Sequence, residues 1–440
     1  MRQVIVVGGG FGGLLVGAEL KRRGIDPLVI EAGKSPGGVA RTIREDGYLL
    51  EPAAGSILLP NPDLSPIFDA AGIPIVAAAP EAGTRYVYDR GTLFEVPESP
   101  KLVLSRLVSW RAKLRAAREP WISAPPPPGE ESVLDFLTRR FGTNLGRLGA
   151  DLMAHGVFAG DAAALSMQAA FPRLVALEAE AGSVVRGGLR RRKARPEGIP
   201  RASVHVPVDG MADVAARLAG YLGEGFVTDR PVQSIRRDNG EWRVDWDGGQ
   251  ESAASVVVAL PPYHATRLVP KPLLGLLADR PAAEVAVVGL GGPVSSLRLP
   301  EGFGVLTGPD SGIRALGILF ESSYAPGRAP VGHQLAKGIY GGAADPEMMQ
   351  RSDDEIGAQM CVDLERILGN AVAPTWIRVI RTAIPQYPIG HAAWMSRVDD
   401  RLGTLPGLHI AGWAYRGIGI SALAADAVRI ASAVGSPSER

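Results

Sequence analysis

The feature that most constrains this chain is a glycine-rich turn between two short apolar segments near its N-terminus. The first apolar segment leads into the sequence GGGFGG, in which Gly8, Gly10 and Gly13 have the G-x-G-x-x-G spacing. A helical pattern follows, and the second apolar segment ends in Glu31. This order of strand, glycine turn, helix, strand and acid predicts a dinucleotide-binding unit.

Each residue of this unit has a physical role in holding a pyrophosphate-linked cofactor. We expect Gly8 to allow the tight turn, Gly10 to let the backbone approach the pyrophosphate, and Gly13 to let the helix pack closely on the strand. The positive end of the helix dipole would face the phosphates. Glu31 is placed to accept hydrogen bonds from the ribose diol.

A second glycine pair, Gly37 and Gly38, follows Glu31 and favours FAD over NAD. It would let the chain pass close to the cofactor a second time, and no third βα unit of an NAD domain is visible. The pattern resembles the extended motif of amine-oxidase-like flavoproteins, in which a C-terminal strand, loop and helix also close the flavin site. The expected FAD contacts are Gly8, Gly10, Phe11, Gly12, Gly13, Glu31, Ala32, Gly37, Gly38, Arg41, Gly55, Ser56, Val232, Gly412, Gly419 and Ile420.

Length, charge and residue usage narrow the remaining classes of protein. The 440 residues suggest two or three domains, and the net charge of +1 gives no general attraction to nucleic acid. Cys361 is the single cysteine, and the six histidines are scattered without metal-ligand spacing. No secretory signal and no apolar run of about 18 residues is visible. We therefore expect a cytoplasmic monomer or homodimer that binds no metal.

The sequence predicts an α/β (α+β) organisation with two insertions in a Rossmann-type FAD-binding domain. The FAD-binding domain is predicted in three parts, at 1–84, 205–262 and 404–440. A helical insertion is predicted at 85–204 and a sheet-rich substrate domain at 263–403.

Within the helical insertion, a basic amphipathic helix is predicted at 102–118, followed by a proline connector at 125–128. The basic run 190–195 is interpreted as a solvated loop. The alternative is electrostatic contact with acidic substrate or anionic lipid, which would place the protein peripherally at the inner face of the cell membrane.

Motifs along most of the chain resemble those of the protoporphyrinogen oxidases and the related coproporphyrinogen oxidases. The segment 156–174 is similar to their G-x-Y-A-G-D…L-S…A-F-P-x-L pattern, and FESSYAPGRAP at 320–330 and AIPQYPIGH at 383–391 also match. The segment AGWAYRGIGI at 411–420 is similar to their A-G-N-x-Y-x-G-V-G-V. On these motifs the chain is identified as a member of this group.

The resemblance implies an enzyme of heme biosynthesis whose porphyrinogen substrate loses hydride from a saturated meso carbon to flavin N5, with O2 as the final acceptor. The flavin carries the chemistry, so no acid–base residue is implied. Arg85 matches the group's basic residue that meets a substrate propionate, with a surface salt bridge as the alternative. Tyr387 and Tyr415 are pocket candidates, with core packing as the alternative for each.

Three departures from the group's motifs lie on the expected flavin-facing side. Ala53-Ala54 stands where the group has G-P, Trp413 replaces Asn, and Ser421-Ala422-Leu423 replaces P-D-C. We expect Trp413 to contact the substrate, because it would narrow the cavity or add a stacking surface. Two alternatives stay open: an oxidase of an amine or another reduced heterocycle in secondary metabolism, and a flavin-loaded binding or assembly protein without catalysis.

Overall fold

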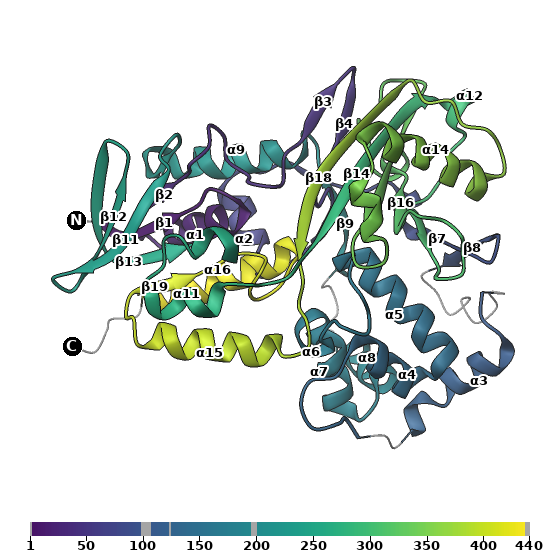
Figure 1. Cartoon of the computed structure of the whole chain (residues 1–440), viewed down its shortest axis with the longest axis horizontal. Helices are drawn as coiled ribbons and strands as arrows, with labels where there is room; N and C mark the ends of the chain where they lie inside the picture. Colours follow the sequence, from purple (N-terminus) through teal and green to yellow (C-terminus); the bar gives the residue numbers. More distant parts are fainter. Residues whose placement is uncertain (1, 98–106, 123–124, 195–199, 436–440) are drawn as a thin grey trace.

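The computed structural model describes residues 2–97, 107–122, 125–194 and 200–435 of the chain. These residues form two seven-stranded sheets, two smaller sheets and a group of helices (Figure 1). The first sheet lies at the left of Figure 1, the second at the upper right, and the helical region below the second. The predicted mixed α/β fold class is confirmed.

The first sheet is assembled from distant parts of the chain. β1 (Arg2–Val7) pairs in parallel with β2 (Pro27–Ile30) and with β13 (Gly249–Val258). β10 (Phe226–Val227) extends the sheet beyond β2, and β19 (Leu408–Ile410) pairs in parallel with β13. Its parallel strands therefore come from the N-terminal, central and C-terminal parts of the sequence.

Helices cover both faces of this sheet, because its parallel strands are apolar on both sides. Val4 and Val6 pack on one face with α1, α9 and α16, whereas Ile5 and Val7 pack on the other face with α11 and α15. These helices span, in the order named, Phe11–Arg22, Gly210–Leu222, Ile420–Gly435, Lys271–Leu277 and His391–Gly403.

An antiparallel hairpin widens the first sheet. It consists of β11 (Val232–Asp238) and β12 (Glu241–Trp246), and β12 pairs with the first half of β13. Its two turn residues, Asn239 and Gly240, have φ values of 48° and 90°. Left-handed conformations at both positions are what a type I′ turn requires, and Asn-Gly is the dipeptide that favours this turn.

The second sheet has the strand order β18-β14-β17-β16-β15-β7-β8, and α14 (Asp353–Leu368) packs on one of its faces. The strands are β7 (Thr84–Asp89), β8 (Thr92–Pro97), β14 (Ala282–Pro293), β15 (Gly304–Thr307), β16 (Gly317–Leu319), β17 (His333–Gly341) and β18 (Trp376–Pro385). The range 85–204, predicted as helical, therefore needs a correction. Its first residues form the β7–β8 hairpin, because β7 pairs in parallel with β15 of the second sheet.

Shorter elements connect these sheets. The small sheets are formed by β3 (Ile43–Glu45), β4 (Tyr48–Leu50), β5 (Ile57–Leu59), β6 (Ile75–Ala77) and β9 (Ser203–Pro207). The short helices are α2 (Ser65–Ala70), α10 (Pro262–Ala265), α12 (Val294–Leu297), α13 (Glu321–Tyr324), η1 (Pro80–Gly83), η4 (Gly223–Gly225) and η5 (Pro346–Gln350).

The helical region differs from the sequence prediction at both of its basic segments. Its elements are α3 (Trp110–Ala117), η3 (Glu119–Trp121), α4 (Val133–Phe141), α5 (Thr143–Phe158), α6 (Met167–Ala170), α7 (Pro172–Ala181) and α8 (Val184–Lys193). α3 starts at Trp110 because the side chain of Ser109 caps it, and 102–106 lie outside the described residues. The basic run at 190–193 is the last turn of α8 and not a loop, since cations at a helix C-terminus complement the helix dipole.

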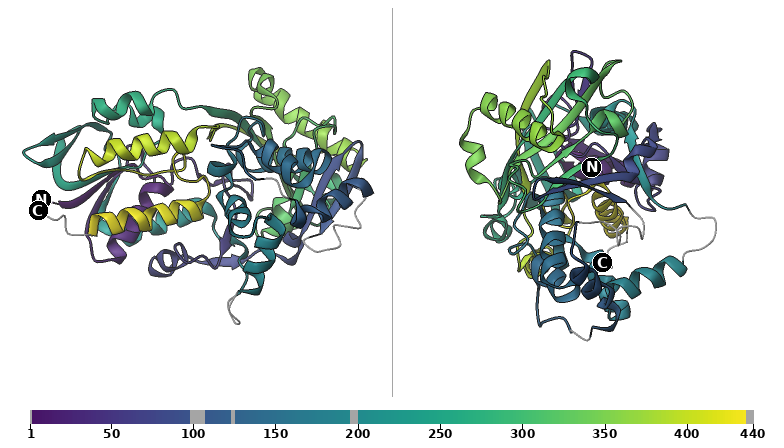
Figure 2. Two further views of the ribbon diagram at one scale, coloured as in Figure 1. Left: turned by 90° about the horizontal axis from the view of Figure 1, so that it is seen from below. Right: turned by 90° about the vertical axis from the view of Figure 1, so that its right-hand side faces the viewer.

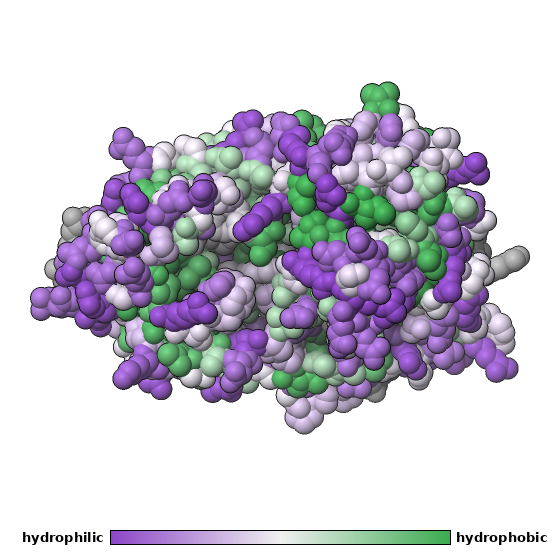
Figure 3. All heavy atoms as spheres, turned by 45° about the horizontal axis from the view of Figure 1, so that its top comes forward, coloured by the Kyte–Doolittle hydropathy of each residue, from purple (hydrophilic) through white to green (hydrophobic). Residues whose placement is uncertain are grey.

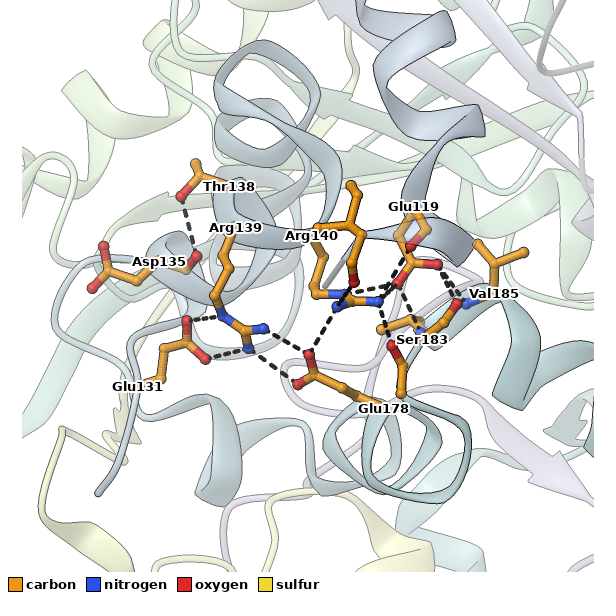
Figure 4. Close-up of polar contacts among 12 residues, drawn as sticks. Glu119, Glu131, Asp135, Thr138, Arg139, Arg140, Glu178, Ser183 and Val185 are labelled. Carbon is orange, nitrogen blue, oxygen red and sulfur yellow. Dashed lines mark hydrogen bonds and ion pairs between the residues drawn. The ribbon is translucent and has the colours of Figure 1, made fainter. Parts of the chain in front are cut away.

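A buried network of charges ties these helices together (Figure 4). Arg140 and Glu119 are both fully enclosed and form an ion pair, and Arg139 bridges two further carboxylates. Glu119 also accepts hydrogen bonds from the first backbone N–H groups of α8. Further partners include Glu131 and Glu178 for Arg139, Gly182 and Glu178 for Arg140, and Ser183 for Glu119. The network thereby fixes η3 to the start of α8.

The surface is mixed in polarity. β1 begins and α16 ends at the same end of the molecule, where Arg23 donates to Ser432 (Figure 2). In Figure 3, hydrophilic side chains cover most of the visible face, and hydrophobic ones gather mainly right of centre. Among the described helices, none has the length and apolarity needed to cross a bilayer.

Replacing Gly13 by Ala should destabilise the protein by about 1–3 kcal/mol, because the added Cβ would lie 1.9 Å from the carbonyl oxygen of Gly8. Gly220→Ala, in α9, is the matched control: its Cβ meets no atom within 4 Å, so it should be neutral or stabilise by up to about 1 kcal/mol. Chemical denaturation of both variants measures this difference. Equal stability of the two variants would show that the helix can shift away from the turn.

Candidate cofactor and substrate site

The glycine turn places the N-terminus of α1 against the carboxyl ends of β1 and β2. Gly8 has φ +110°, and its carbonyl lies so close to Gly13 that no side chain fits there. Gly10 caps α1 in an extended conformation without any side-chain cap, and the first turn of the helix contains no acid. The backbone N–H groups of that turn are therefore donors for an anion such as a pyrophosphate.

Glu31 lies directly beside this turn. Its Oε2 accepts a hydrogen bond from the N–H of Gly9 at 2.6 Å, and its Oε1 accepts one from Gly33 at 2.8 Å. Each carboxylate oxygen has a second lone pair, so the same group can still accept from a ribose hydroxyl. The backbone of Glu31 also accepts from the N–H of Arg230, which brings the segment leading to Val232 next to it.

The second glycine pair, Gly37 and Gly38, lies directly against the first glycine turn. Gly37 forms a bridge with Gly10, and its N–H donates to the carbonyl of Gly9 at 2.8 Å. A Cβ on Gly38 would lie 3.1 Å from the Cα of Gly10. Arg41 is exposed and donates from Nε to the carbonyl of Gly38. Ala32 follows Glu31 at the same end of β2.

The loop after β19, near the C-terminus, lies against the glycine turn at the start of α1. A Cβ on Gly12 would lie 3.1 Å from the Cα of Gly412, so α1 and the end of β19 touch through their backbones. The loop then passes through Trp413 to Gly419 and enters α16 at Ile420. Residues predicted from opposite ends of the sequence as FAD contacts are thus neighbours.

Tyr387 holds this loop. Its buried hydroxyl donates to the carbonyl of Trp413 at 2.6 Å and accepts from the N–H of Gly417 at 2.8 Å. Burial raises the pKa of this phenol above its ordinary value, so the hydroxyl keeps its proton. The geometry favours a structural role for Tyr387, which was a pocket candidate.

Tyr415 belongs to the core on the other face of the first sheet. It is fully buried beside Trp394, and its hydroxyl donates to the carbonyl of Leu260. Its own carbonyl faces Nε2 of His391 at 2.8 Å. Burial lowers the pKa of His391 to about 4, so this imidazole is neutral and donates to Tyr415. Tyr415 is therefore a core residue, which was the alternative to its prediction as a pocket residue.

The segment from Glu51 to Ser56 crosses between the two large sheets. Glu51 is fully buried and accepts hydrogen bonds from Thr42, Met211 and Arg328 through Oε1. Burial raises the pKa of this carboxyl, while the charge of Arg328 acts in the opposite direction. Arg328 also approaches the carbonyl of Gly55 at 3.5 Å. Gly55, a predicted flavin contact followed by Ser56, therefore lies beside buried charges that the sequence prediction had not assigned to the site.

Arg85 lies on the second sheet, on the face opposite α14. In the register of the strands, Arg85 is opposite Gly304, Gly304 opposite Leu319, and Leu319 opposite Lys337. Because paired residues share a face, the two cations belong to one row across the sheet. Arg85 packs over the ring of Phe303, and its burial lowers the pKa of its guanidinium.

Lys337 was missed by sequence reasoning. The available signal was a single cation inside the apolar strand 335–340. No group of His, Cys, Asp or Glu side chains suited to a metal ion occurs among the described residues.

Comparison with known proteins identifies the class of protein to which the chain belongs. A family model for flavin-containing amine oxidoreductases matches residues 11–429. The chloroplastic protoporphyrinogen oxidase 1 of Spinacia oleracea is 30% identical over 88% of this chain and 75% of that protein. The coproporphyrinogen III oxidase of Bacillus subtilis is 24% identical over 95% of each. A crystal structure from Exiguobacterium sp. 255-15 superposes with a TM-score of 0.81 over 98% of each chain, at 24% identity.

The chain belongs to the flavin-containing amine oxidoreductase family. It is an FAD-dependent oxidoreductase, which favours catalysis over the alternative of a flavin-loaded assembly protein. The donor set fits this cofactor, because an uncapped helix N-terminus, a carboxylate and three glycine segments meet without side chains between them.

Glu31→Ala should raise the dissociation constant of FAD by about 10- to 100-fold, since a charge-assisted hydrogen bond contributes about 1.5–3 kcal/mol. Glu31→Gln keeps one acceptor oxygen, so its dissociation constant for FAD should rise less. Glu301→Ala, at an exposed residue, should leave the constant unchanged. Titration of the apoproteins with FAD measures the three constants. An unchanged constant for Glu31→Ala would show that this carboxylate does not hold the ribose.

Proposed function

We propose that this enzyme oxidises a porphyrinogen-type tetrapyrrole to the aromatic porphyrin in heme biosynthesis, with O2 as electron acceptor. The observation that carries the proposal is the position of Arg85. It lies on the same face and row of the second sheet as Lys337, whose ammonium touches the segment leading to Gly55. We therefore propose that this cation, in the same row as the lysine that contacts Ala53, is the partner of a substrate carboxylate.

In this proposal the chain binds and orients the substrate, and FAD, when bound, accepts the hydride. Arg85 forks onto a propionate with two hydrogen bonds, which fixes the orientation of the macrocycle as well as its affinity. The glycine segments and the loop held by Tyr387 position the cofactor. Proximity and orientation, together with exclusion of water, are the contributions left to the protein.

Trp413 is the departure that bears most on substrate choice. Its side chain is half-buried and packs against the same core cluster as Ala53 and Leu423, which mark the other two departures. The three departures therefore contribute to one hydrophobic cluster, to which the indole adds a volume that the asparagine of the group lacks. We propose that Trp413 forms a wall of the substrate cavity beside the flavin.

Anaerobic mixing with candidate donors tests the reaction. Reduction of the flavin, seen as loss of its visible absorbance, should follow addition of coproporphyrinogen or protoporphyrinogen and be reversed by O2. Reduction only by primary or cyclic amines would favour the amine oxidase alternative and overturn the tetrapyrrole proposal. Reduction by porphyrinogen without reoxidation by O2 would contradict the assignment of the acceptor.

Arg85→Met should raise the Michaelis constant for a propionate-bearing porphyrinogen by about 10- to 100-fold and change turnover less. The contact lies away from the reacting carbon, so ground state and transition state should lose it equally. Arg236→Met, at an exposed cation of β11, is the matched control and should leave both constants unchanged. A fall in turnover with an unchanged Michaelis constant would reject carboxylate binding by Arg85.

We also propose that the helical region makes a peripheral contact with anionic membrane. Trp110 and Trp121 are 65% and 81% exposed, and Leu189 is half exposed on the neighbouring α8. The last turn of α8 carries four cations, and the buried network fixes η3 with Trp121 to the start of this helix. Exposed Trp beside Arg and Lys is the composition that suits the headgroup layer of an anionic bilayer.

Cosedimentation with lipid vesicles tests this contact. The protein should bind phosphatidylcholine vesicles that contain phosphatidylglycerol, and binding should weaken with salt and after Trp110→Ser/Trp121→Ser. Tyr263→Ser, at an exposed aromatic residue of α10, is the matched control. Equal binding of all variants, or equal binding to vesicles without phosphatidylglycerol, would reject this surface as the contact.

A further inference from the structure

A lysine lies inside the second sheet, on the face that meets the segment 51–56, which we call the flavin-side segment. Lys337 occupies the middle of β17 and is 4% exposed. Leu335 and Ile339, two residues away on either side, share its face of the strand. Across the sheet it is paired with Gly289 of β14 and Leu319 of β16.

The ammonium of Lys337 uses its donors on two different parts of the molecule. Nζ lies 2.6 Å from Oε1 of Glu321, the first residue of α13. It also donates to the carbonyl of Glu51 at 3.0 Å and approaches the carbonyl of Ala53 at 3.4 Å. One side chain of the substrate sheet therefore holds two backbone carbonyls of the segment that leads to Gly55.

The partner Glu321 lies against the same segment. A Cβ on Gly55 would be 3.7 Å from Oε1 of Glu321 and 3.0 Å from the Cβ of Glu51, so the backbone of Gly55 is enclosed by the two glutamates. Among the described residues, Oε2 of Glu51 and Oε2 of Glu321 have no hydrogen-bond partner. The negative charge at this position depends on Lys337 and Arg328 for compensation.

Stability alone does not explain a buried lysine here. Replacement of a buried ion pair by apolar residues of similar size is often neutral or stabilising, because burial removes both charges from water. What an apolar side chain cannot do is direct hydrogen bonds to the carbonyls of Glu51 and Ala53. The retained charge thus fixes the position of a backbone segment.

We propose that Lys337 is a positioning residue that sets the flavin-side segment Glu51–Ser56 relative to the substrate sheet. Glu321 holds the ammonium in place, and the bonds to Glu51 and Ala53 transmit its position to Gly55 and Ser56. The inference rests on the proposed placement of the flavin beside Gly55.

The test compares four variants of the FAD-loaded protein: Lys337→Met, Lys337→Arg, Glu321→Gln and Lys337→Met/Glu321→Gln. Lys337→Met leaves Glu321 uncompensated, so its thermal midpoint should fall and its visible circular dichroism, which reports flavin geometry, should change. The double variant should recover the thermal midpoint. It should keep the altered dichroism and an FAD dissociation constant raised at least about tenfold, because the bonds to the carbonyls are still missing. Lys337→Arg should restore the dichroism in part.

Arg314→Met/Asp345→Asn removes a partly exposed ion pair of similar geometry and is the control, expected to leave the dichroism unchanged. Recovery of dichroism and FAD affinity together with stability in the double variant would overturn the inference, since Lys337 would then be a structural residue only. These readouts need no substrate. The inference can therefore fail while porphyrinogen still reduces the wild-type flavin, and it can hold when porphyrinogen does not.

Discussion

The structure depends on backbone contacts that only glycine permits. Gly13 packs so closely on Gly8 that an added Cβ would lie 1.9 Å from its carbonyl oxygen. Gly38 packs on Gly10 and Gly12 packs on Gly412, and in each contact an added Cβ would lie 3.1 Å from the opposite Cα. These contacts bring the N-terminal turn, the second glycine pair and the C-terminal loop to one edge of the first sheet. A cofactor bound there would meet N–H groups and helix ends directly, without intervening side chains.

Buried charges fix the parts that glycine contacts do not. Glu51 pairs with Arg328, and Lys337 of the second sheet pairs with Glu321 and donates to the backbone of the segment 51–56. In the helical region, Arg140 and Glu119 play the corresponding part between η3 and α8 (Figure 4). Removal of one partner from such a pair leaves a charge without compensation, so each pair resists rearrangement of the segments that it joins.

Local patterns predicted the first sheet well, because its signals are short in range. The glycine spacing and the acid after β2 each depend on a few consecutive residues, and the structure forms the predicted turn between β1 and α1 with Glu31 beside it. The prediction of a basic helix at 102–118 was wrong in extent, because α3 begins at Trp110. The prediction of a loop at 190–195 was wrong in type, because residues 190–193 are helical. The ends of these two helices depend on the cap at Ser109 and on the helix dipole of α8.

The site was only partly predictable for a related reason. Tyr387 and Tyr415 occur in one motif-rich part of the sequence, yet one holds the C-terminal loop and the other lies in the core across the sheet. Which face a side chain takes depends on long-range pairing. The row from Arg85 to Lys337 likewise exists only through the register of four strands.

The most direct measurement is hydrogen–deuterium exchange of the apoprotein against the FAD-loaded protein. Binding of FAD should slow exchange in the segments 8–13, 31–41, 51–57 and 410–420 together, because one extended ligand contacts all four. The helical residues 133–158 should change little. Protection confined to 8–13 and 31–41 would contradict the placement of the flavin ring, since the cofactor would then touch the first sheet without reaching the second sheet or the C-terminal loop.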